Sequence, residues 1–314
     1  MRNNTQIQDW IEQSLASDPP RAKSLVMTVF GDAIAPHGGA IWLGSLISLM
    51  SHFAINDRLV RTSVFRLTEE GWLEAKRDGR RSSYQLASAS YARFQHAYQR
   101  VYTPQSTAWD QSWILVIASN NESNATERGN LKRELFWEGF RLISPGVYAH
   151  PQPDIAALQS ILERTNLLDQ LLVCKTQDLT QVSNRPLSSL IASQWQLDEI
   201  NHSYRQFIQH FSALPELMVK QELSAQAAFT IRSLLIHNFR RTQLHDPHLP
   251  VELRPAGWLG DVAYQLCKTV YQSCFQQAEE LLAQALAEGP PSALVNNPDL
   301  HERFAAVNQS VQKT

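Results

Sequence analysis

The sequence has few cysteines, and this limits the classes of protein to which it could belong. Its 314 residues include three, Cys174, Cys267 and Cys274, and no Cys-x-x-Cys pair occurs. A secreted domain built on a disulfide framework, or a zinc site built on paired cysteines, would need more. We therefore expect three reduced thiols in a cytoplasmic protein.

Long apolar runs are also missing. The most apolar early stretch, AIWLGSLISLM at residues 40–50, is too short and too interrupted to cross a bilayer. The first twenty residues contain no extended apolar run, so we expect no signal peptide. Neither secretion nor a membrane partner is expected.

Common catalytic motifs are absent too. The sequence contains no HExxH, GxSxG, GxxxxGK[ST] or GxGxxG pattern. His245 and His248 could be two metal ligands, but they lack a third ligand at a defined spacing, and the proline between them indicates a polar loop. His202 and His210 lie eight residues apart without a cysteine or carboxylate pattern. We expect no enzymatic activity, no cofactor and no metal.

A strong overall charge is lacking, whereas one segment is clearly basic. The formal net charge is −2, which argues against a protein coated with basic surface. Between residues 58 and 81, seven basic and four acidic side chains give a local charge of +3. Positive charge is therefore concentrated in a short stretch of a slightly acidic chain.

The pattern around this stretch predicts three helices. Apolar residues recur at helical spacing over 24–32 and again over 41–53, with a Pro- and Gly-rich loop at 35–40 between them. Asn56 is a good N-cap for a third helix from Asp57 to about residue 70.

A β-hairpin is predicted directly after the third helix. The segment EAKRDGRRSSYQL, residues 74–86, alternates apolar and polar positions around Asp78-Gly79, which is a strong hairpin signal. Three helices followed by a hairpin indicate a winged helix-turn-helix, in which the third helix enters the major groove of DNA.

Two groups of side chains in this region are candidate DNA contacts. We assign base edges or flanking phosphates to Arg58, Arg61, Thr62 and Arg66, and phosphates or the minor groove to Arg77, Arg80 and Arg81. The alternative is a solvated basic hairpin on a domain that binds protein.

The middle of the chain predicts a second domain. Strands are expected at 113–119, on either side of Pro145-Gly146 and at 171–176, with helices at 127–140 and 154–168. This βαββαβ order is ferredoxin-like. From about residue 188 the spacing is helical, interrupted by a loop with three prolines between His245 and Trp258.

Several long segments resemble one protein family. The stretches GDAIAPHGGAIWLGSLI, RTSVFRLTEEGWLEAKRDGRRSSYQL, LLIHNFRR, DPHLPVELRPAGW and QLCKTVYQ closely resemble the PaaX family, repressors of phenylacetic acid degradation genes in bacteria. The resemblance implies a homodimeric repressor that binds a palindromic operator in double-stranded DNA and is released by phenylacetyl-coenzyme A.

The resemblance also implies roles for the other two domains. The family's central domain is similar to the nuclease Cas2, which needs an Asp just after its first strand. Here Ser119, Asn120 and Asn121 follow the strand and Asp110 precedes it, so we expect dimerisation and spacing rather than hydrolysis. Arginines suit the phosphates of a coenzyme A thioester and tryptophan suits a ring, so we assign its binding to four residues, His237, Arg240, Arg241 and Trp258. Alternatively, His237 and Trp258 are core residues and the arginines bind carbonyls.

Together these features predict an α+β multidomain chain with an N-terminal winged helix-turn-helix, a central ferredoxin-like, Cas2-like domain and a C-terminal α-helical domain. The expected boundaries are an N-terminal arm at 1–20, the winged helix at 21–104, the ferredoxin-like domain at 105–182, the effector-binding helices at 183–290 and a tail at 291–314. We interpret the protein as a repressor of phenylacetate catabolism. The alternative is an acyl-coenzyme A-binding protein or enzyme that uses its winged helix for protein interaction.

Overall fold

The chain divides into two compact units. The computed structural model describes residues 5–103, 108–118, 125–165, 167–179, 182, 186–192, 194–287, 289–290 and 303–304. The first unit comprises Met1–Pro104, Gln206–Arg241 and Asp261–Thr314, and the second comprises Gln105–Arg205 and Thr242–Gly260. Each unit therefore combines segments that are distant in the sequence.

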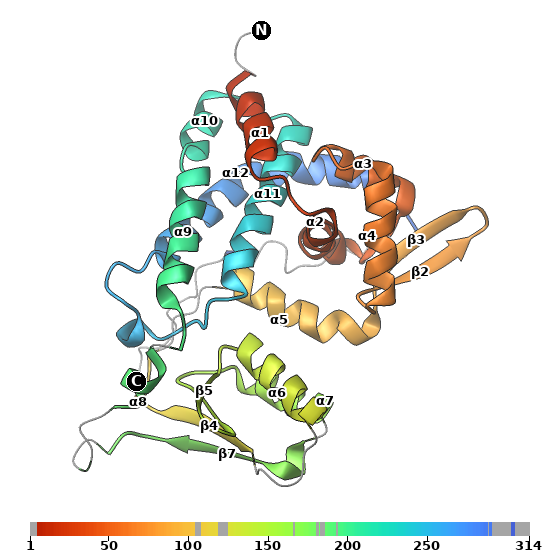
Figure 1. Cartoon of the computed structure of the whole chain (residues 1–314). Helices are drawn as coiled ribbons and strands as arrows, with labels where there is room; N and C mark the ends of the chain where they lie inside the picture. Colours follow the sequence, from red (N-terminus) through yellow and green to blue (C-terminus); the bar gives the residue numbers. More distant parts are fainter. Residues whose placement is uncertain are drawn as a thin grey trace, which may run out of the picture. The chain divides into compact units, whose positions relative to one another are not determined.

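The N-terminal part of the first unit contains helices and a small sheet (Figure 1). In chain order its elements are α1 (Thr5–Ser17), α2 (Ala22–Val29), the π-helical turn η1 (Phe30–Ile34), the 3₁₀ turn η2 (Ala35–His37), β1 (Ala40–Trp42), α3 (Leu43–Ser51), α4 (Asp57–Glu69), β2 (Leu73–Asp78), β3 (Arg81–Leu86), the 3₁₀ turn η3 (Ser88–Ser90) and α5 (Tyr91–Tyr102).

Helix α4 begins and is buried as the sequence predicts. The Asn56 side chain accepts a hydrogen bond from the Leu59 backbone N–H at 3.0 Å, which satisfies one of the free donors of the first turn. Val60, Val64 and Leu67 form its buried stripe, and α2 and α3 both pack against α4.

The sheet contains one strand more than predicted. Its order is β1-β3-β2, and all pairs are antiparallel. The prediction that the loop reaches residue 40 and that a helix starts at residue 41 is wrong, because Ala40–Trp42 pairs with β3, with Ile41 opposite Tyr84. This pairing partner lies more than forty residues away, beyond the reach of local periodicity.

The hairpin turn is displaced by one residue from the predicted position. Asp78 pairs with Arg81, so the two loop residues are Gly79 and Arg80. Gly79 has φ +56° and Arg80 is not among the residues with positive φ, which is the pattern of a type II′ turn. Glycine is favoured at the first loop position because other residues rarely adopt positive φ.

The rest of the first unit is helical. It contains the end of α9 (Leu197–Phe211), α10 (Leu214–Lys220), most of α11 (Ala225–Gln243) and nearly all of α12 (Gly260–Leu286). Of the predicted tail, Arg303 and Phe304 are described, and both are buried, at 5% and 0% exposed. These two residues therefore belong to the core. The remaining residues of 291–314 lie outside the described part of the chain.

The second unit contains a four-stranded antiparallel sheet. Its elements are β4 (Trp113–Ala118), α6 (Ala125–Trp137), β5 (Arg141–Ser144), β6 (Val147–His150), α7 (Ile155–Thr165), the 3₁₀ turn η4 (Leu168–Gln170), β7 (Leu171–Thr176), α8 (Leu187–Ala192), the start of α9 and the 3₁₀ turn η5 (Val251–Leu253). The strand order is β5-β6-β4-β7. The predicted βαββαβ order is confirmed.

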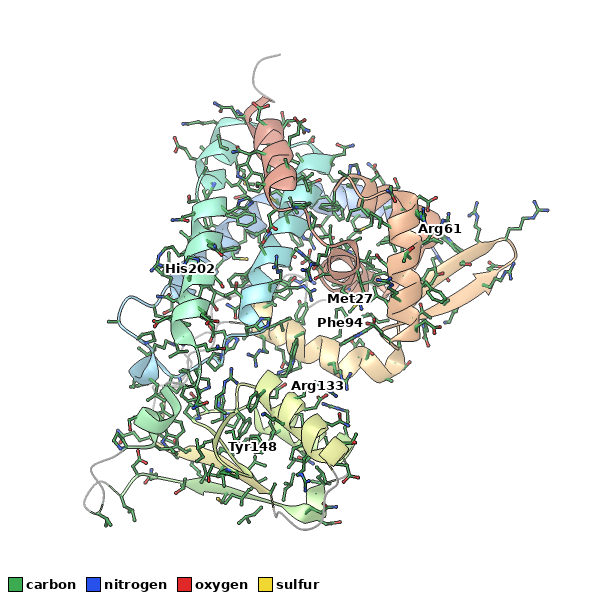
Figure 2. The ribbon with its side chains drawn as sticks, in the orientation of Figure 1. Met27, Arg61, Phe94, Arg133, Tyr148 and His202 are labelled. Atoms are coloured by element: carbon green, nitrogen blue, oxygen red, sulfur yellow. The ribbon has the colours of Figure 1, made fainter. Side chains whose placement is uncertain are left out.

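Both faces of this sheet carry buried apolar side chains. Leu135 of α6 and Ile161 of α7 pack with Val116 and Tyr148 on one face (Tyr148 is labelled in Figure 2). Trp113 and other side chains of the sheet pack with Trp195 in a second cluster. No helix in the described residues is long and apolar enough to span a membrane.

The three cysteines agree with the expectation of reduced thiols. All are free; Cys267 and Cys274 are buried and Cys174 is half-buried. Burial raises the pKa of Cys274 to about 12, so this thiol stays protonated and unreactive.

Candidate nucleic-acid interface

The predicted basic residues are exposed. We call seven cations of α4 and the hairpin the basic surface: Arg58, Arg61, Arg66, Lys76, Arg77, Arg80 and Arg81. Every one of them is solvent-exposed, and so is Thr62. On α4, Arg58 and Thr62 lie on the side of the helix opposite its buried stripe, and Arg61 and Arg66 lie on the flanks of that stripe; Figure 2 shows Arg61 on this helix.

Most of these cations are not neutralised by carboxylates. Arg61 pairs with Asp57, one turn earlier on α4, with Nε and Oδ1 2.6 Å apart and both side chains more than half exposed. Within the described residues, no ion pair involves Arg58, Arg66, Lys76, Arg77 or Arg80. These five positive charges are available to a polyanion.

Two nearby carboxylates are already engaged elsewhere. Glu70 forms an ion pair with Lys23, and Glu74 accepts a hydrogen bond from the Gln85 side chain on the neighbouring strand. The Lys23 ammonium therefore offsets the negative charge of Glu70, whereas the neutral Gln85 amide leaves the charge of Glu74 in place.

The third strand anchors the hairpin at its base. Trp42 of β1 pairs with Ser83 of β3, and the Arg81 guanidinium lies 6.0 Å from the centre of the Trp42 ring. At this distance a cation is attracted to the negative face of an aromatic ring. Strand β1, which the sequence did not predict, thus helps to orient Arg81, one of the predicted phosphate contacts.

His237 is held inside the first unit. Its Nδ1 lies 3.0 Å from Thr28 Oγ1, and the Thr28 hydroxyl donates to the Ser24 carbonyl. The imidazole therefore carries its proton on Nδ1 and donates it to Thr28. Burial, followed by the charges of Arg240 and Arg241, lowers the pKa of His237 to about 3, so the ring is neutral.

The two neighbouring arginines differ in burial. Arg240 Nη2 donates to the backbone and hydroxyl oxygens of Ser24, both at 3.2 Å. Burial lowers the pKa of Arg240, and within the described residues no carboxylate pairs with it. Arg241 is exposed, with Nη1 3.8 Å from Asp18. These contacts show His237 and Arg240 joining α11 to α2.

Trp258 belongs to the second unit, unlike the other three predicted effector residues. Its ring meets the Tyr204 ring edge-on, with centroids 5.6 Å apart. Nearby, the Asn201 side chain accepts a hydrogen bond from the Leu259 N–H and donates one to the Gly257 carbonyl. The loop that ends at Trp258 is thus tied to the start of α9.

A buried charge cluster in the first unit was not predicted. We call it the Asp32 cluster: Asp32, Tyr102, Arg232, Tyr271, Glu279 and Arg303. Asp32 Oδ2 accepts from Arg232 Nε at 2.7 Å, and Oδ1 accepts from Arg303 Nη1 at 2.9 Å. The side chains of all three are 1% or 2% exposed.

Tyrosines and a second carboxylate complete this cluster. The hydroxyls of Tyr102 and Tyr271 both bind Asp32 Oδ1. Arg232 also pairs with Glu279, whose other oxygen lies 2.8 Å from His37 Nε2. Burial alone would raise the pKa of Glu279, but the bond to His37 and the charge of Arg232 lower it to about 2. A sequence signal for this cluster is the arginine inside the apolar run AAFTIRSLLI at 227–236.

The polar residues on either side of β4 are the candidates for a nuclease site, and the one that is described makes structural contacts. Asp110 is exposed and bonded to Lys175 and to Ser112, which holds the pKa of its carboxyl below the usual value. Ser119, Asn120 and Asn121 lie outside the described residues. Among the described residues, no group of three or more His, Cys, Asp or Glu could hold a metal ion.

An exposed cationic helix beside a cationic hairpin forms a surface that favours a polyanionic partner. Three family models match the chain: the PaaX-like protein at residues 21–90, the PaaX protein central Cas2-like domain at 106–187 and the PaaX-like protein C-terminal domain at 195–284. The chain is also 35% identical over 270 residues to the transcriptional repressor PaaX of Escherichia coli (strain K12), covering 85% of each protein. This protein belongs to the PaaX family.

A solved structure supports the fold independently. The chain is similar to the uncharacterised protein Rv0674 from Mycobacterium tuberculosis, with a TM-score of 0.53 and 20% identity. The match covers 83% of this chain and 98% of that one. At this identity the likeness concerns the fold alone.

Proposed function

We propose that this protein is a transcriptional repressor that binds double-stranded DNA through the basic surface. The observation that carries the proposal is a set of exposed, largely unpaired cations on α4 and the β2–β3 hairpin, within a chain of net charge −2. In this proposal α2, α3, α4 and the three-stranded sheet act as a winged helix-turn-helix. Helix α4 enters the major groove and the hairpin follows the neighbouring backbone.

Different residues serve affinity and sequence discrimination in this arrangement. Arg77, Arg80 and Arg81 lie at or next to the hairpin turn and suit phosphates, whose contacts carry no sequence information. The other four assigned residues, Arg58, Arg61, Thr62 and Arg66, suit base edges or the phosphates that flank them. The operator is palindromic and the protein binds it as a homodimer in the cytoplasm, with the central domain serving dimerisation and spacing.

We further propose that phenylacetyl-coenzyme A releases the protein from its operator. Arg240 and Arg241 suit the anionic groups of the coenzyme, while His237 and Arg240 connect α11 to α2. Because α2 packs on α4, a ligand that shifts α11 would shift the helix that reads DNA. The ligand acts only through a difference in its affinity for the two states.

The proposal is tested by operator binding over a range of salt concentrations. The R80A/R81A variant should bind all DNA sequences more weakly, and the slope of log affinity against log salt should fall by about 2 between about 50 and 200 mM salt. K220A, which removes an exposed lysine of α10, is the matched control and should behave like the parent.

Arg61 tests the assignment to base edges in the same assay. R61A should reduce discrimination between operator and unrelated DNA by about 1–3 kcal/mol if its contact is bidentate. Adding phenylacetyl-coenzyme A to the parent complex should release the DNA. Parent-like binding by both arginine variants would refute the groove assignment, and turnover of the thioester without an operator footprint would favour an enzyme.

A further inference from the structure

Arg303 and Phe304 occupy a built site in the first unit. The Arg303 guanidinium lies 4.5 Å from the ring centre of Tyr102, 4.9 Å from that of Tyr98 and 5.9 Å from that of Tyr271. Its Nε donates to the Tyr98 hydroxyl at 2.8 Å, and its Nη1 donates to Asp32. A carboxylate surrounded by tyrosines is a receptor for a planar cation.

Phe304 fills the adjoining space. It is fully buried, with its ring 5.1 to 5.4 Å from the ring centres of Tyr271, Tyr102 and Tyr264. Its backbone N–H donates to the Tyr102 carbonyl at 3.2 Å. Its φ is +58°, an unfavourable conformation for a bulky residue that persists only when the surroundings hold it.

The walls of this site come from other parts of the chain. Asp32 lies in η1, Tyr98 and Tyr102 in α5, and Tyr264 and Tyr271 in α12. Gly31 keeps α5 close to η1, because a Cβ at this position would lie 2.4 Å from the Phe94 ring. These elements form the receptor without any contribution from the C-terminal segment.

Two features lower the free-energy cost of releasing Arg303 and Phe304 from this site. Arg232 and the two tyrosine hydroxyls still engage Asp32 when Arg303 is absent, so the carboxylate is not left alone. Arg303 Nη2 is buried and has no hydrogen-bond acceptor among the described residues, so the fit is incomplete and its cost lowers the affinity.

We propose that Asp32 and the tyrosines around it, Tyr98, Tyr102, Tyr264 and Tyr271, form a binding site for an arginine–aromatic peptide segment, and that the C-terminal segment that carries Arg303-Phe304 is its dissociable intramolecular ligand. When bound, the segment joins η1, α5 and α12; when it is released, these elements lose a shared contact. Any consequence for DNA binding rests on the function proposed above, whereas occupation of the site does not.

The test uses the full-length chain with its own ligand removed by substitution. A fluorescent peptide of residues 299–314 is titrated against the R303A/F304A variant and the parent, and its anisotropy is measured without DNA. The variant should bind the peptide at least about tenfold more tightly than the parent. In the parent, the chain's own C-terminal segment competes with the peptide at an effective concentration near the millimolar range. The same peptide with R303A should bind at least about tenfold more weakly.

Folding of the R303A/F304A variant is checked by circular dichroism. The F304A variant, which keeps the Arg303 guanidinium, is titrated with the same peptide as a second test protein. A folded variant that does not prefer the native peptide over its R303A form would overturn the proposal. So would loss of cooperative folding in both variants, since the segment would then be an indispensable part of the core. The titration without DNA tests the peptide site alone, so peptide binding supports the site even if the protein does not bind DNA. A second titration with operator DNA present then tests whether the two binding events are linked.

Discussion

The basic surface and the Asp32 cluster lie in the same compact unit and use arginine in opposite ways. On the basic surface, seven cations face solvent, and most have no carboxylate partner in the described part of the chain. In the cluster, Arg232 and Arg303 are almost completely buried and share Asp32. Exposed arginine without partners favours a polyanion, whereas buried arginine depends on the carboxylate that neutralises it.

The largest effect should come from removing the buried carboxylate. D32N leaves two buried guanidinium groups without their shared charge, and we expect a loss of about 3–5 kcal/mol in the free energy of unfolding. D57N removes the exposed partner of Arg61 and should cost less than about 1 kcal/mol. Urea unfolding of both variants measures this difference. Equal losses would remove the distinction between the two regions.

The two regions also differ in how far the sequence predicts them. The basic surface comes from residues 58–81, so helix periodicity, the Asn56 cap and the Asp78-Gly79 hairpin signal are sufficient to place it. Asp32, Arg232 and Arg303 are separated by 200 and 71 positions along the chain, and only the packing of α11 and α12 with the N-terminal elements brings them together. Local patterns do not identify the partners in such contacts, although the arginine inside the apolar run at 227–236 signals that one buried cation needs a partner.

The same reasoning explains the smaller errors. Ile41 and Trp42 continue an apolar helical pattern, but β3 recruits them as a strand. The turn shifted by one residue because the register is set by pairing along the whole hairpin, from Leu73 opposite Leu86 to Asp78 opposite Arg81. The observed hydrogen-bond partner of His237, Thr28, is 209 residues away along the chain, so local patterns do not predict this contact.

A smaller effect is expected on the pH dependence of the unfolding free energy, to which the buried His237 should contribute and an exposed histidine should not. Because the folded-state pKa of His237 is lowered from 6.5 to about 3, the unfolded chain binds the extra proton first as the pH falls. Its contribution to stability is present above pH 6.5 and is lost progressively below it, by about 2 kcal/mol between pH 7 and pH 5.

The variant that tests this is H237N, whose amide can still donate to Thr28 but does not titrate. It should lack this part of the pH dependence of the unfolding free energy, measured by urea unfolding at both pH values. H202N, which replaces an exposed histidine on α9 (Figure 2), is the control and should keep the parent's slope. A parent-like slope in H237N would mean that the buried imidazole is not the group responsible.

The smallest effect on stability concerns an exposed aromatic residue of α4, next to the basic surface. Phe65 lies on α4 one turn after Arg61 and is 64% exposed, whereas Phe304 is fully buried in the Asp32 cluster region. F65A should change the free energy of unfolding by no more than about 0.5 kcal/mol, because it removes few packed atoms. It should nevertheless weaken operator binding, since an exposed aromatic ring on a helix in the major groove can contact thymine methyl groups. V219A, which shortens an 88% exposed side chain on α10, is the matched control for both measurements. If F65A lowers stability strongly or leaves operator affinity unchanged, the exposed face of α4 does not read DNA as proposed.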